Sequence, residues 1–137
     1  MSLNRQPFLF LQESKLKLQS FLPAILWWLI TLVLFTLPGS TFPKNPLYEL
    51  IQLDKWIHAF LFFTLCFLFY KPFKKSNKQT GTIAWLLPLI ACTYGIIIEF
   101  VQEYLIVNRS FDVWDIAADA VGCALAYSWF TRHIKES

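Results

Sequence analysis

The stretch EFVQEYLIVNRSFDVWDIAADAVG, from Glu99 to Gly122, places five carboxylates and one arginine between apolar segments. A charged side chain in the hydrocarbon core of a bilayer is costly. Acids beside a membrane span therefore usually face a bundle interior or a water-filled cavity, and they mark a functional site. Whether that rule applies here depends on whether the flanking segments cross a membrane.

The composition is that of a membrane protein. Of the 137 residues, 56% are hydrophobic and only 15% are charged. Soluble domains contain about 45–50% apolar and about 25% charged residues. The chain is therefore too apolar for one soluble domain and too short for several.

Four apolar runs approach the roughly 20 residues that a membrane-spanning helix needs. The predicted spans cover approximately residues 21–37, 51–70, 83–103 and 113–131. Together they predict one domain over residues 1–137, an all-α integral membrane bundle of four transmembrane helices.

The lysine and arginine residues predict the orientation, because cytoplasmic loops carry an excess of both. Nine of the 12 fall on one side of the predicted spans: Arg5, Lys15, Lys17, Lys71, Lys74, Lys75, Lys78, Arg132 and Lys135. Both termini are therefore expected to be cytoplasmic, in the inner (plasma) membrane of a bacterial-type cell. The loops after the first and third spans are expected outside.

This orientation brings polar ends of three spans into one outer layer. Within each span the polar residues recur at three- or four-residue spacing, which places them on a shared helix face. The predicted pocket comprises Asp54, Lys55, His58, Glu99, Gln102, Arg109, Asp112, Asp115 and Asp119. At about 1.5 Å per residue, Asp119 lies roughly 10 Å below Asp112. At that depth we expect Asp119 to hydrogen-bond across to the second or third span.

Three motifs carry a family resemblance: DKWIH at 54–58, EFVQ at 99–102 and RSFDVWDIAADAVG at 109–122. In this order on three spans, they resemble the VanZ-like family of small integral membrane proteins. The family is associated with reduced sensitivity to the glycopeptide antibiotic teicoplanin. The resemblance implies a role in antibiotic resistance at the cell envelope but no established reaction. The family commonly has Asn where this chain has Asp119, and Gly where it has Ala126.

The predicted outer layer holds six acids against two permanent cations, Lys55 and Arg109. An unpaired buried charge is costly, so this excess of negative charge predicts bound protons, a bound cation or a basic group of a ligand. A purely structural network is the alternative. In that case Asp112 caps the fourth helix, and the negative charge of Asp115 interacts favourably with the dipole at the N-terminus of that helix. Lys55 and Arg109 are then counter-ions.

Three functions remain compatible with these residues. In the favoured one, Arg109 and Lys55 hold a phosphate or carboxylate of an envelope lipid, an envelope precursor or a glycopeptide-like ligand. In the second, His58, Glu99 and Asp115 bind a divalent cation in a metal-assisted membrane hydrolase or transferase. In the third, the bundle is structural or forms an ion path. Membrane lipid is the expected partner and nucleic acid is not, because the basic residues lie on membrane flanks.

Overall fold

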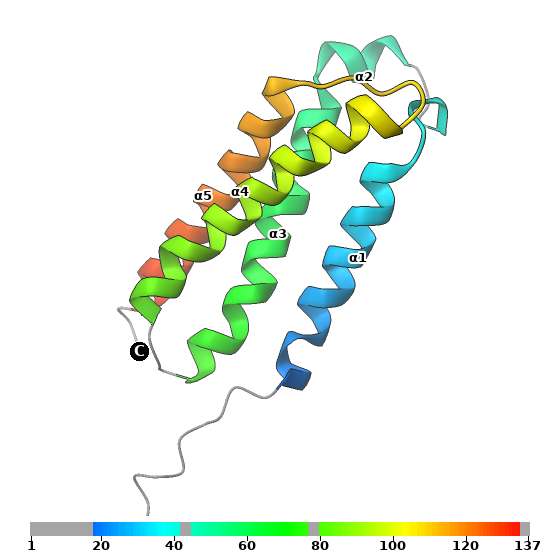
Figure 1. Cartoon of the computed structure of the whole chain (residues 1–137). Coiled ribbons are helices and arrows are strands. Elements are labelled where there is room, and N and C mark those ends of the chain that lie inside the picture. Colours follow the sequence, from blue (N-terminus) through cyan, green and yellow to red (C-terminus); the bar gives the residue numbers. More distant parts are fainter. Residues whose placement is uncertain (1–17, 42–44, 77–79, 135–137) are drawn as a thin grey trace, which may run out of the picture.

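A computed structural model describes residues 18–41, 45–76 and 80–134, and every regular element in these ranges is helical (Figure 1). The long helices are α1 (Leu22–Thr36), α3 (Leu53–Ser76), α4 (Thr80–Leu105) and α5 (Val113–Ile134). The short elements are α2 (Pro46–Leu50) and the 3-10 turns η2 (Leu18–Phe21) and η3 (Gly39–Thr41). The predicted all-α class is confirmed.

Within the described ranges, three segments are long and apolar enough to cross a membrane: Leu18–Thr36, Leu53–Lys74 and Gly81–Leu105. They correspond to the first three predicted spans. Helix α5 is not among them, and its two aspartates, Asp115 and Asp119, lower its hydropathy. The fourth span therefore stays a prediction.

The long helices alternate in direction, and α5 lies along α3 and α4 (Figure 1). The end of α1, helix α2, the start of α3 and the α4–α5 connection gather at one end of the bundle. We call this the α2 end. The α3–α4 connection and the end of α5 lie at the opposite end.

The tightest seam of the bundle lies between α3 and α5. A Cβ atom at Gly122 would overlap the carbonyl oxygen of Ala59, so only glycine allows the two backbones to approach this closely. Farther along the seam, the rings of Tyr70 and Phe130 stack with centroids 4.1 Å apart. The Tyr70 hydroxyl donates to the carbonyl of Ala84 at 2.6 Å, which ties α4 to the same seam.

The outer surface of the bundle is strongly apolar. Large side chains such as Leu26, Val33 and Ile90 are more than half exposed. In water such a continuous apolar surface would drive association, whereas in a bilayer it contacts lipid. The apolar surface and the length of the helices therefore both indicate a membrane protein.

The side on which each end lies is a prediction that cysteine labelling tests. Ser40 is exposed at the α2 end, and Ser76 is the last residue of α3 at the opposite end. Because the lysine and arginine pattern of the sequence predicts that opposite end to be cytoplasmic, Ser40→Cys is expected to react with an impermeant thiol reagent added to intact cells, and Ser76→Cys is not. The reverse labelling pattern would invert the proposed orientation. The parent chain, with its own three cysteines, is the control.

Candidate functional site

Lys55, in the first turn of α3, is the centre of an ion network at the α2 end. Its Nζ lies 2.8 Å from Asp112 Oδ2, 2.9 Å from Asp115 Oδ1 and 3.1 Å from Asp54 Oδ2. A lysine ammonium has three N–H donors, and all three are used here. The arrangement favours the interpretation of Lys55 as a counter-ion that ties α3 to α5, rather than as a group that holds a ligand anion.

His58 lies one turn deeper on α3 and is buried against α5. Its Nδ1 is 2.9 Å from Asp119 Oδ1, at hydrogen-bond distance. Its Nε2 is 3.7 Å from Asp115 Oδ2, beyond the usual range of a hydrogen bond. The Phe35 ring of α1 covers the imidazole, with ring centroids 4.7 Å apart. The two ring nitrogens therefore have different environments.

Glu99 of α4 is completely buried, with 0% of its surface exposed. Its Oε2 accepts a hydrogen bond from the backbone N–H of Asp112 at 2.9 Å. Its Oε1 is also buried and has no hydrogen-bond partner among the described residues. One oxygen of this carboxylate therefore fixes the start of α5, while the other lacks a hydrogen-bond donor.

Two further polar residues of α4 have structural contacts. Gln102 donates from Nε2 to the carbonyl of Phe35 at 3.0 Å, which joins α4 to α1. Glu103 Oε2 accepts from the backbone N–H of Phe111 at 2.7 Å. The Glu103 bond holds the α4–α5 connection in place, and with it the residues that precede α5.

Asp112 both caps α5 and pairs with α3. Its Oδ1 accepts from the backbone N–H of Trp114 at 2.8 Å, the bond expected of an N-cap aspartate. The hydrogen bond from Lys55 to its other oxygen holds the pKa of the Asp112 carboxyl below its ordinary value. Asp112 therefore stays ionised to a lower pH than a free aspartate does.

Two glycines and two residues with positive φ shape the site locally. A Cβ at Gly95 would lie 2.5 Å from Asp119 Oδ2, so glycine leaves the room that this carboxylate fills. Gln52 and Asn108 have φ of 49° and 58°, in the left-handed region. Gly39 donates its backbone N–H to the carbonyl of Val107 at 3.1 Å, and packs directly on Asn108. This contact fixes the loop that carries Arg109.

Among the residues that the structure describes, two groups of side chains have the geometry of a cation site. Oxygen or nitrogen atoms of His58, Glu99 and Asp115 lie within 4.8 Å of one another, and so do oxygens of Asp54, Asp112 and Asp115. The Lys55 ammonium already contacts all three members of the second group. The Lys55 ammonium thus occupies the second group, and the first group is the candidate for an added ion.

A cleft of about 1020 Å³ opens at the α2 end. Five of the nine predicted pocket residues line it: Asp54, Lys55, His58, Arg109 and Asp112. The other four are not among its lining residues: Glu99, Gln102, Asp115 and Asp119. His58, which lines the cleft and also contacts Asp115 and Asp119, links the two groups.

The cleft also has polar residues that the sequence interpretation missed: Asn45, Tyr48, Glu49, Gln52 and Asn108. Most of them belong to α2 or its flanks. A signal for α2 was present in the sequence, because Asn45 followed by Pro46 is the combination of an N-cap and a first-turn proline. In the structure the Asn45 side chain accepts from the N–H of Leu47 at 3.0 Å.

The apolar helices and the buried charged residues at the α2 end define a small helical membrane protein. The sequence profile of the VanZ/LLP1 family matches residues 6–134, nearly the whole chain, so the protein belongs to this family. An uncharacterized protein of Schizosaccharomyces pombe is 40% identical over 75 residues, which is 53% of this chain and 43% of that protein. The match thus covers less than half of the relative's length. No solved structure matches the chain.

Proposed function

We propose that the protein binds the charged head group of a membrane lipid or lipid-linked envelope precursor in the cleft at the α2 end. The observation that carries this proposal is the mixed lining of the cleft. Arg109 and Asp112 line it together with the apolar side chains Leu34, Phe35 and Leu61. A site of this kind suits a ligand with a charged part and an apolar part.

Arg109 is the residue that best fits the anionic part of such a ligand. An arginine side chain has five N–H donors in a planar fork, which matches the oxygens of a phosphate or carboxylate bidentately. Arg109 and Asp112 both line the cleft. The ligand anion is therefore assigned to Arg109, and the ionised Asp112 suits a cationic or hydroxyl group of the same ligand.

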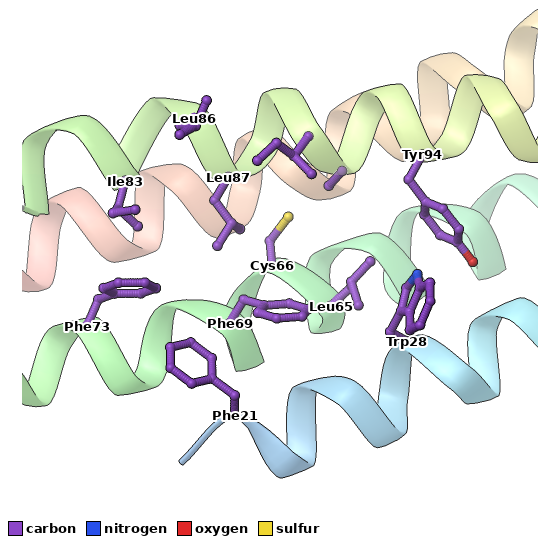
Figure 2. Close-up of a pocket in the computed structure, with 12 residues that line it drawn as sticks. Phe21, Trp28, Leu65, Cys66, Phe69, Phe73, Ile83, Leu86, Leu87 and Tyr94 are labelled. Carbon is purple, nitrogen blue, oxygen red and sulfur yellow. The ribbon is translucent and has the colours of Figure 1, made fainter. Parts of the chain in front are cut away.

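A second, apolar pocket supports a lipid as the ligand. It has a volume of about 340 Å³ and lies between α1, α3 and α4, where Phe69, Leu87 and Trp28 are among the side chains that line it (Figure 2). Leu61 of the cleft and Leu65 of this pocket are one turn apart on α3. An acyl or prenyl chain that follows α3 from the cleft would meet this pocket.

The exposed apolar residues of α2 and its C-terminal flank fit an interfacial position for the cleft. Leu47, Leu50 and Ile51 are each more than half exposed. Short helices with such residues lie at the boundary between head groups and acyl chains. Under the predicted orientation, this boundary is the extracytoplasmic face of the plasma membrane. A ligand from the envelope would also fit the teicoplanin association of the family.

The proposal predicts that Arg109→Gln weakens binding of a phosphate-bearing lipid by about 10-fold or more, because a charge-assisted hydrogen bond contributes about 1.5–3 kcal/mol. Binding of phosphatidylglycerol, a polyprenyl phosphate and diacylglycerol to the purified full chain is measured by native mass spectrometry. The two phosphate-bearing probes distinguish a bulk lipid from a precursor carrier, and diacylglycerol lacks the anion.

The matched control is Arg132→Gln, which removes an exposed arginine from the last turn of α5 at the opposite end. Its lipid affinity should equal that of the parent. Equal losses in both variants would show non-specific attraction of anionic lipid. Binding of diacylglycerol as tight as that of the phosphate-bearing probes would contradict the proposal.

A further inference from the structure

We infer that His58, Glu99 and Asp115 form a binding site for one divalent transition-metal ion. The three residues come from α3, α4 and α5, and all are at least nine-tenths buried. One potential ligand atom from each lies within 4.8 Å of the other two. Convergence of three helices on such a small volume is the first observation that points to an ion.

The second observation is the orphaned oxygen of Glu99. Its Oε1 is buried without a hydrogen-bond partner among the described residues, although its carboxylate belongs to the set. Leaving a buried carboxylate oxygen unpaired is unfavourable. A bound cation would satisfy it, and would also relieve the repulsion between the Glu99 and Asp115 carboxylates.

The orientation of His58 is the third observation. Metal-binding histidines usually donate their second ring N–H to a carboxylate, which fixes the tautomer and leaves the other nitrogen free to coordinate. Here Nδ1 is 2.9 Å from Asp119 Oδ1, and Nε2 faces Asp115 at 3.7 Å, too far for a good hydrogen bond. Asp119 is thus a positioning residue for the imidazole that coordinates.

The donor set indicates the kind of ion. One imidazole nitrogen and two carboxylate oxygens are ligands that Zn²⁺ accepts, and three protein ligands leave a coordination position open. Carboxylates also suit Mn²⁺, while imidazole suits the transition metals over Ca²⁺ or Mg²⁺. Because His58 also lines the cleft, an ion bound here would lie beside the cleft. The inference stands whether or not a lipid is the ligand of that cleft.

The test begins with the full chain purified in detergent and treated with a chelator. The stripped protein is titrated with ZnCl₂ and with MnCl₂ while the melting temperature and the retained metal are measured. We expect about one ion per chain and a rise in melting temperature, because an ion that binds only the folded state stabilises it. A chain that retains neither ion, and whose melting temperature neither ion changes, would overturn the inference.

Variants then locate the ion. Asp119→Asn changes an outer-shell partner and should reduce metal affinity by about 10–100-fold. Glu99→Gln removes the charge of a ligand itself, so its loss of affinity should be larger. Glu49→Gln is the matched control, because Glu49 lines the cleft next to His58 but does not belong to the metal set. Equal losses for Glu49→Gln and Glu99→Gln would show adventitious binding by the acidic residues of the α2 end and would refute the site.

X-ray absorption at the metal edge provides a readout that does not depend on any variant folding. The inference requires nitrogen and oxygen ligands only, including one imidazole. The thiols of Cys66 and Cys123, whose Sγ atoms are 3.6 Å apart, are the competing ligands in the core. A sulfur ligand in the spectrum would place the ion at these thiols and contradict the inference. Binding of phosphatidylglycerol to the stripped chain tests the cleft separately.

Discussion

Lys55→Met is expected to destabilise the folded protein by about 3 kcal/mol. Methionine retains most of the apolar stem but leaves three aspartates without the ammonium that they share. Removing one partner of a buried ion pair typically costs about 3–5 kcal/mol, because the remaining charge stays buried and uncompensated. The lower end applies here, since 55% of the Asp54 side chain and 36% of the Asp112 side chain are exposed to solvent. Equilibrium unfolding in mixed detergent micelles measures the change.

Lys71→Met is the matched control for this prediction. Lys71 belongs to the same helix, and its Nζ lies 5.0 Å from the centre of the Phe67 ring. Loss of such an exposed cation–π contact costs about 0.5–1 kcal/mol. If the two lysine variants lose equal stability, the ion network at Lys55 has no special role.

A second substitution tests the electrostatic origin of the loss. In the Lys55→Met background, Asp115→Asn removes one of the uncompensated charges and should restore part of the stability. In the parent background the same change should destabilise the protein, because it removes a partner of Lys55 and leaves His58 facing an amide. The double-mutant cycle isolates this coupling. Additive losses would contradict a direct interaction between the two side chains.

The sequence predicted the long helices well, because each apolar run is close to the length of a membrane span. The predicted first span, residues 21–37, nearly coincides with α1 (Leu22–Thr36). The predicted second span ends at residue 70, whereas helix α3 continues to Ser76. Hydropathy marks the part of a helix that suits hydrocarbon, and the polar turn beyond it stays helical without contributing to that signal.

The sequence also identified which polar residues share a helix face, but not which partners they find across helices. Spacing alone placed Asp54 and His58 together on α3. It did not predict that Lys55, between them, would contact one aspartate of its own helix and two at the start of α5. Nor did it predict that Gln102 would donate to the backbone carbonyl of Phe35. Those contacts depend on the rotation and relative depth of neighbouring helices, which are set by packing such as the close approach at Gly122.

Asp119→Leu is expected to damage the protein strongly, whereas Asp119→Asn should leave its stability within about 1 kcal/mol of the parent. Asp119 is 1% exposed and its Oδ1 lies 2.9 Å from His58 Nδ1. An asparagine oxygen can accept the same hydrogen bond. Leucine leaves the buried imidazole nitrogen unpaired, which costs about 1–3 kcal/mol. Its branched end must also fit beside Gly95, and overpacking adds about 1–3 kcal/mol.

Melting temperatures of the two purified variants measure this difference, and metal retention measured in parallel separates folding from coordination. A stable Asp119→Asn variant with weakened metal binding is the pattern of a residue that orients His58 through a hydrogen bond. If Asp119→Asn melts as early as Asp119→Leu, the negative charge of Asp119, rather than its hydrogen-bond acceptor, is what holds His58 in place. A charge retained at that depth of α5 would then favour the ion-path alternative over a ligand-binding cleft.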